Sequence, residues 1–136
     1  MSHFTTLETQ IVSAAHLAQA LKAMGFPEVE VHDEPQTLFG VEGFARDLRA
    51  EIIVRRQHVG EASNDLGFQR LPDGRFRAII SDWDLRHYDA KWLQTLTQRY
   101  AYYVAVDTLQ EQGFAIASEE VEADRTVRLV ARRMGG

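Results

Sequence analysis

One uninterrupted stretch, from Asp89 to Gln112, constrains the fold of this chain more than any other feature of its sequence. It contains neither glycine nor proline and carries aliphatic and aromatic residues along its length. Such a stretch should form one α-helix of about six turns, because each turn takes 3.6 residues. Asp89 is of a type that caps helix N-termini, and Gly113 of a type that follows helix ends. The sequence therefore predicts a single helix over residues 89–112.

Apolar side chains fall on two sides of this predicted helix, since successive residues are separated by about 100°. Such a helix needs shelter on both sides. We expect a sheet against the wider stripe. The narrower stripe would meet either the loop at residues 84–89 or, in a homodimer, a second copy of the chain. The wider stripe holds Trp92, Leu93, Leu96, Tyr100, Tyr103 and Val104, and the narrower one Tyr102, Val106 and Leu109.

Asp107 interrupts the wider stripe. A carboxylate at a buried position must find hydrogen bonds or a cation. Arg128 and Arg132, on the last predicted strand, are candidates to supply the positive charge. We interpret Asp107 either as half of a structural pair or as a residue that emerges from the core as the helix drifts outwards, and the alternative is a functional acid.

The start of the chain predicts a strand followed by a shorter helix. Residues Phe4 to Val12 are rich in threonine and apolar side chains, which favours a strand. Ser13 stands at an N-cap position, and apolar residues then recur at helical spacing over residues 14–24. Gly25-Phe26-Pro27 ends that helix, because proline cannot continue it.

The remaining segments predict strands separated by turns. Pro72-Asp73-Gly74 is the clearest turn, because proline fixes φ and glycine accepts a positive φ. Turns are also expected at residues 33–36 and 122–125. The predicted strands are Val29–Val31, Leu38–Phe44, Arg49–Gln57, Leu66–Leu71, Arg75–Trp83, Ala115–Val121 and Thr126–Arg132.

These elements predict one α+β domain over residues 1–136, with a mainly antiparallel sheet and two helices on one face. The order strand, helix, Gly-Phe, strand, turn, strand occurs over residues 4–44 and again over 76–132. We interpret this as a βαββ pseudo-repeat around a central meander, either by duplication or because such units are common.

Composition excludes several classes of site and partner. The chain has 136 residues and no cysteine, so disulfides, thiolate zinc sites and a cysteine nucleophile are ruled out. Its net charge of −5 makes nucleic acid and anionic membranes less favourable partners. No run of 18 apolar residues and no secretory signal is visible. We expect a cytoplasmic protein, or one of a plastid interior if it is organelle-encoded.

Three blocks of sequence, spread nearly from end to end, carry a family resemblance. They are Met1–Thr6 with Thr9, Gln98–Tyr102 with Gly113-Phe114, and Asp82-Trp83 with Asp124–Val130. Together they resemble the uncharacterised family named after hypothetical chloroplast reading frame 35, found in plastids, cyanobacteria and other bacteria. The resemblance implies a small α+β fold, brings no established activity or catalytic residues, and suggests an ATPase of the AAA type as a partner.

The chain departs from that family's pattern at two positions. Asp84 stands where the resemblance leads us to expect a second tryptophan, and Arg125 where it leads us to expect the glycine of an Asp-Gly turn. The second departure implies a different turn, because arginine does not favour positive φ.

Residues 82–89 are the segment densest in side chains able to bind or react. At a strand end, Asp82 and Asp84 would project to the same side and His87 could approach from the loop. Two carboxylates and an imidazole suit a divalent metal or an acid–base pair. Aspartates are also common in turns, so we favour a structural role and predict neither metal nor cofactor.

The sequence therefore favours a non-enzymatic accessory or adaptor protein that acts through protein contacts, with a second copy of the chain as one partner. Aromatic and arginine side chains carry most interface energy. Two alternatives stay open: a small metal- or metabolite-binding enzyme that uses Asp82, Asp84 and His87, and a structural subunit of a larger assembly. The predicted contact residues are Trp83, Tyr88, Trp92 and Tyr102, with Val106 and Leu109 in the dimer alternative.

Overall fold

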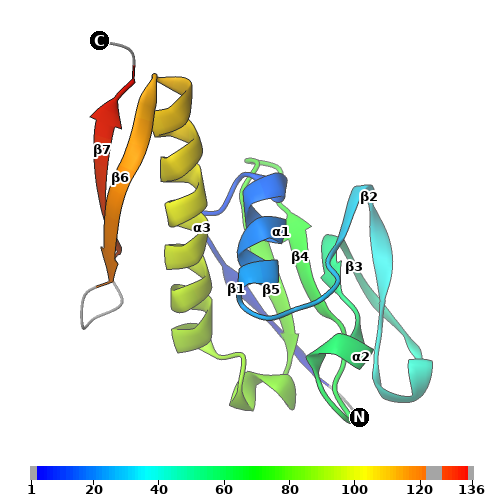
Figure 1. Cartoon of the computed structure of the whole chain (residues 1–136). Helices are drawn as coiled ribbons and strands as arrows, with labels where there is room; N and C mark the ends of the chain where they lie inside the picture. Colours follow the sequence, from blue (N-terminus) through cyan, green and yellow to red (C-terminus); the bar gives the residue numbers. More distant parts are fainter. Residues whose placement is uncertain (1–2, 122–126, 135–136) are drawn as a thin grey trace.

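A computed structural model describes residues 3–121 and 127–134 of the chain. Five strands form an antiparallel sheet in the order β1-β5-β4-β3-β2, and two more form a separate hairpin (Figure 1). All the strand pairs described are antiparallel, so the predicted α+β class is confirmed. The elements are β1 (Phe4–Glu8), α1 (Ala14–Ala23), β2 (Glu30–Phe39), η1 (Val41–Gly43), β3 (Ala45–Val54), α2 (Arg56–Val59), β4 (Leu66–Arg70), β5 (Phe76–Ser81), η2 (Asp84–Arg86), α3 (Ala90–Glu111), β6 (Phe114–Val121) and β7 (Val127–Arg133).

The two long helices, α1 and α3, pack on one face of the five-stranded sheet, as predicted (Figure 1). Alternate strand residues point to this face, because side chains along a strand alternate between faces. The core between the layers includes Leu17, Leu21, Leu93 and Leu96 from the helices and Ile52, Val54, Phe68, Phe76, Ala78 and Ile80 from the strands.

The opposite face of the sheet has a smaller core of its own. Ile53 and Ile79 point to it, and Leu38 from β2 covers them. Gly67 makes this cover possible: a Cβ there would lie 2.9 Å from a Leu38 methyl and 3.0 Å from Ala50 Cβ. The edge strand β2 therefore shelters part of the sheet face that the helices leave open.

Helix α3 matches the prediction almost to the residue. Its N-cap is Asp89, whose side chain accepts a hydrogen bond from the Trp92 N–H, and Gly113 follows its end with φ +86°. Leu93 and Leu96 are buried, and Trp92, Tyr100 and Tyr103 pack beside them. The wider stripe thus faces the sheet and α1, as expected.

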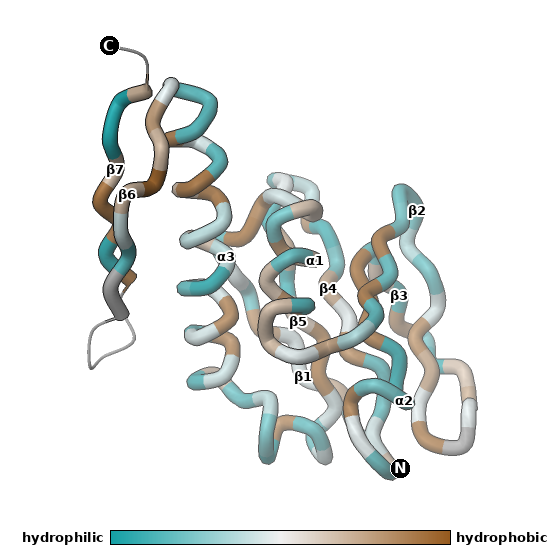
Figure 2. Tube along the Cα trace, viewed as in Figure 1, coloured by the Kyte–Doolittle hydropathy of each residue, from teal (hydrophilic) through white to brown (hydrophobic). Residues whose placement is uncertain are grey.

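The hairpin β6–β7, and not the 84–89 loop, lies against the narrower stripe of α3. The Tyr102 hydroxyl donates a 2.6 Å hydrogen bond to Glu119 of β6. The loop lies at the N-terminal end of the helix, about 18 Å along its axis from Tyr102 at 1.5 Å per residue. Figure 1 shows α3 between the hairpin and the main sheet, and Figure 2 shows hydrophobic residues recurring along it.

The region after α1 corrects the sequence interpretation. Two short strands around a turn at residues 33–36 were expected, but one strand, β2, runs through it. The pairing with β3 shifts from Val31↔Ile52 to Gln36↔Ala50, so the residues between bulge outwards. Pro35 is tolerated there because β2 is an edge strand and proline lacks only a backbone donor.

Other boundaries differ by smaller amounts. The first strand ends at Glu8 rather than Val12, and β3 begins at Ala45 rather than Arg49. Residues predicted to end that strand form the short helix α2 instead. The turn expected at residues 122–125, including Arg125, lies outside the described residues.

The repeat predicted over residues 4–44 is wrong in its boundaries, because the two strands expected after α1 form the single strand β2 and the next strand, β3, lies beyond residue 44. A βαββ order then remains on both sides, with different arrangements. In the first, β2 and β3 join the main sheet, whereas in the second β6 and β7 pair only with each other. Within the described residues, no helix is both long and apolar enough to cross a membrane.

Candidate interaction surface

The structure does not bring the predicted trio of Asp82, Asp84 and His87 together. Asp84 is 2% exposed, whereas Asp82 and His87 lie at the surface. The strand ends at Ser81 and the chain enters a turn, so the alternation that would have aligned the two carboxylates no longer applies. The described residues hold no group of three or more metal-ligating side chains. The projection of Asp82 and Asp84 to the same side, on which the metal or acid–base alternative depended, is therefore not found.

Asp84 instead ties two loops together. One carboxylate oxygen, Oδ2, accepts hydrogen bonds from the Ser81 hydroxyl at 2.6 Å and from the Asn64 N–H at 2.9 Å. The Asn64 side-chain amide donates to Ser81 Oγ at 2.9 Å. A buried carboxylate needs such donors. The aspartate that departs from the family pattern thus has a structural role in this chain.

Asp65, which is fully buried, fixes a third loop in the same way. It accepts hydrogen bonds from the backbone N–H groups of Phe39 and Arg56, each at 2.7 Å. The Val41 N–H donates to the side chain of Asn64 at 3.0 Å. The loop after β2 is therefore held to the loop before β4, which is held to Asp84.

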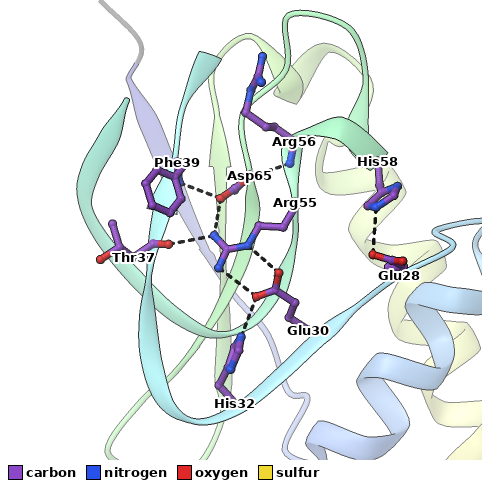
Figure 3. A network of polar contacts seen from close by, with 9 residues as sticks. All are labelled: Glu28, Glu30, His32, Thr37, Phe39, Arg55, Arg56, His58 and Asp65. Carbon is purple, nitrogen blue, oxygen red and sulfur yellow. Dashed lines mark hydrogen bonds and ion pairs between the residues drawn. The ribbon is translucent and has the colours of Figure 1, made fainter. Parts of the chain in front are cut away.

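Arg55 is the cation of this scaffold (Figure 3). It forms an ion pair with Asp65 at 2.8 Å and contacts both carboxylate oxygens of Glu30, at 2.8 and 2.9 Å. His32 contacts the same carboxylate at 2.7 Å. The hydrogen bonds from Arg55 hold the pKa of Glu30 below its ordinary value, against the opposing effect of burial. The network fastens the bulged edge strand to β3 and β4.

These contacts build one surface at an end of the sheet, which we call the loop end: residues 39–46, 60–65 and 82–87 (Figure 1). Three large apolar side chains are exposed on it: Phe44 at 62%, Trp83 at 48% and Phe39 at 37%. The Arg86 guanidinium lies 3.4 Å from the Trp83 ring centroid. Exposed aromatic and arginine side chains on a fixed backbone are features of protein-binding sites.

The predicted contact residues divide between this surface and the interior. Trp83 belongs to the loop end. Tyr88 and Trp92 are half-buried with ring centroids 5.0 Å apart, and the Tyr88 hydroxyl donates to the Val59 carbonyl. Burial raises the pKa of Tyr88, with the nearby Asp84 charge as the lesser cause. These two rings therefore serve mainly to join α3 to the loop before it.

The other predicted residues lie further along α3. Tyr102 is half-buried, and its hydrogen bond to Glu119 raises its pKa. Val106 and Leu109 are half-buried on the same helix. An apolar groove of about 290 Å³ lies between α3 and the hairpin, lined by Gln98, Ala101, Tyr102, Ala105, Val127 and Leu129.

Asp107 has a partner that sequence reasoning did not identify. Its side chain is 54% exposed and contacts the His16 imidazole, whereas Arg128 and Arg132 were the expected cations. The other ring nitrogen of His16 lies 2.6 Å from the Ser13 hydroxyl, which caps α1. The structural-pair interpretation keeps its support, with a different partner and a more exposed carboxylate.

Sequence reasoning missed Phe44, Asn64 and Asp65. The Ser-Asn-Asp run at residues 63–65 is typical of a turn, which is why it carried no functional signal. An isolated Phe44 beside Gly43 could have been noticed as an aromatic residue in a loop. Nothing local indicates that Asn64 and Asp65 bond to loops more than 15 residues away.

The fold and its loop end define a small α+β protein with exposed aromatic side chains on loops that are held by buried hydrogen bonds. The chain belongs to the family described as "Protein of unknown function (DUF1257)", whose model matches residues 20–130. It is 27% identical to uncharacterized protein ycf35 of Cyanophora paradoxa and 24% identical to that of Pyropia yezoensis, each over 98% of both chains. The resemblance inferred from sequence is thereby confirmed. No solved structure matches it.

Proposed function

We propose that this protein is an accessory or adaptor module that binds another protein through the loop end. The observation that carries the proposal is the exposure of Phe44 and Trp83 on loops fixed by the buried carboxylates of Asp65 and Asp84. A surface ordered before binding loses little conformational entropy when a partner docks.

The chemistry of the loop end supports a protein partner. Aromatic side chains bury a large area with few rotatable bonds, and they are enriched where partners meet. Arg86, stacked on Trp83, adds donors beside an apolar ring. An ATPase of the AAA type stays a predicted partner, as does a second copy of the chain. We place the protein in the cytoplasm, or in a plastid interior if it is organelle-encoded.

Site-specific photocrosslinking in the native cell tests the proposal. The photoreactive residue p-benzoylphenylalanine replaces Phe44 in one variant, Trp83 in a second and Val12 in a third. Val12 is a matched control, because it is 52% exposed and follows the opposite end of β1. We expect the same discrete adduct from positions 44 and 83 and none from position 12.

Two results would count against the loop end as the partner-binding surface. Equal adducts from position 12 would indicate non-specific contact, and no adduct from positions 44 and 83 would remove the surface from consideration. A structural subunit of a larger assembly, the alternative reading, predicts adducts from several faces at once.

A further inference from the structure

Arg46, near the start of β3, has an unusual setting within the loop end. Its guanidinium lies on the backbone of Gly40. A Cβ at position 40 would come within 2.5 Å of Nη2 and 2.8 Å of Cζ, and nearer still to Nε. Gly40 has φ −93°, which any residue adopts, so glycine is required there for space rather than for backbone conformation. The absence of a side chain at position 40 leaves the space that the Arg46 guanidinium occupies.

The Arg46 guanidinium has one N–H donor, at Nε, without a hydrogen-bond acceptor among the described residues. Arg46 Nε is buried and has no hydrogen-bond partner, and no other buried side-chain nitrogen or oxygen among residues 3–121 and 127–134 shares that condition. Arg55, by contrast, donates through Nε, Nη1 and Nη2 to two carboxylates and a carbonyl. Buried donors are almost always paired, so the guanidinium of Arg46 keeps hydrogen-bonding capacity that the described residues do not use.

The surroundings of Arg46 combine this cation with an apolar contact. Its loop is closed by hydrogen bonds from the Gly40 N–H to the Phe44 carbonyl, at 2.7 Å, and from the Gly43 N–H to the Gly40 carbonyl, at 3.0 Å. Phe44 projects from the same loop with 62% of its surface exposed. A ligand that covers Phe44 would shield the neighbouring guanidinium from water, which strengthens any charged hydrogen bond there.

We propose that Arg46 binds a carboxylate of the partner protein: the side chain of an aspartate or glutamate that adjoins an apolar residue resting on Phe44. This inference rests on the proposed function and names the chemistry that the loop end recognises. A guanidinium pairs with a carboxylate through parallel N–H···O bonds. The net charge of −5 disfavours a polyanion but not a single carboxylate within an apolar contact.

Side-chain NMR of the intact protein offers a direct test. The probe is N-acetyl-aspartyl-phenylalanine amide, and its asparaginyl counterpart is the control. We expect the Nε–Hε signal of Arg46 to shift with the aspartyl probe only. The signal of Arg55 should stay fixed, because its Nε already donates to Glu30. Equal shifts with the asparaginyl probe would overturn the proposal, as would a shift produced equally by inorganic phosphate.

Two variants sharpen the experiment. Arg46→Gln removes the charge, whereas Gly40→Ala keeps it and displaces the guanidinium, which can move because it ends a flexible side chain. Each variant should bind the aspartyl probe about tenfold more weakly, which is the effect expected when a charged hydrogen bond is lost. Unchanged affinity in both variants would refute the role of Arg46. If adducts from positions 44 and 83 persist undiminished in Arg46→Gln, the proposed function stands and this inference fails.

Discussion

His16 Nε2 lies 2.5 Å from the Asp107 Oδ2 atom and joins the two helices that cover the sheet. The imidazole also contacts the Ser13 hydroxyl, so the contact connects the start of α1 to the last turns of α3. Tyr100 adds to the junction: its hydroxyl accepts hydrogen bonds from the Val12 and Ser13 N–H groups, at 3.1 and 3.0 Å. Polar groups therefore fix how the helices meet, beside the apolar core.

The exposure of Asp107 predicts a small energetic role for its contact with His16. More than half of the Asp107 side-chain surface is exposed, and solvent weakens ion pairs at such positions. Asp107→Asn should lower the free energy of unfolding by less than about 1 kcal/mol. Urea denaturation measures this, with Leu96→Ala as a core control that should lose about 2–5 kcal/mol. If Asp107→Asn lowered the free energy of unfolding by several kcal/mol, its ion pair would contribute as much as a buried one and the prediction would be wrong.

Ser13, His16 and Asp107 are the three residue types of a serine-hydrolase triad, but the serine here is a helix cap. Its Oγ accepts a hydrogen bond from the His16 N–H at 3.3 Å. Ser13→Ala should therefore cost about 1 kcal/mol of stability, and Ser13→Asp, which keeps a capping oxygen, much less. A fluorophosphonate probe should leave Ser13 unmodified. Stoichiometric labelling of Ser13 would contradict the structural role.

The helices could be predicted from sequence because their information is local. Residues at helical spacing, with Ser13 and Asp89 as caps, define α1 and α3 without knowledge of the rest of the fold. Strand β2 was harder, because its continuity depends on pairing with β3 through a bulge that no local pattern specifies. Pro35 indicated a turn, because proline is accepted in a strand only at a sheet edge and the local sequence does not show that β2 is an edge strand.

The candidate site was harder still, because its contacts are distant in sequence. Asp84 and Asn64 meet across 20 positions, and Phe39 and Asp65 across 26. The acid cluster at residues 82–87 was visible, but its side chains diverge once the chain leaves the strand. Trp83, a predicted contact residue, is exposed in the structure, whereas Phe44 needed the fold to show that it shares the same end of the sheet.

Asp84 and Asp82 make a matched pair for testing the scaffold. Asp84→Ala would leave the Ser81 hydroxyl and the Asn64 N–H unpaired in the interior, so we expect a loss of about 1–3 kcal/mol. Asp82→Ala, at an exposed position two residues away, should change stability by less than about 0.5 kcal/mol. Urea midpoints of the two variants give the comparison. Equal losses would mean that the buried hydrogen bonds do not hold the loops.

The lowered pKa of Glu30 predicts a pH dependence of stability. Its ordinary value is 4.5, and the hydrogen bonds from Arg55 lower it in the folded protein. The unfolded chain then binds a proton more readily, so this contribution is present above pH 4.5 and is lost as pH falls through the folded-state pKa. Glu30→Gln should flatten that part of the stability profile measured by urea denaturation between pH 3 and 7. A profile identical to that of the unmodified protein would contradict the assignment.

Adjacent residues on β7 distinguish the two roles considered for the second face of α3. Leu129 lines the groove against the helix, whereas Val130 points away and is 46% exposed. Leu129→Asp should lower the free energy of unfolding by about 1–2 kcal/mol, because it places a charge against apolar surface. Val130→Asp should lower it by less than about 0.5 kcal/mol, with the same loss of strand propensity. Sedimentation of both variants separates packing from assembly: dissociation of an oligomer by Val130→Asp alone would show that the outer face of the hairpin, and not the stripe of Tyr102, Val106 and Leu109, joins two copies.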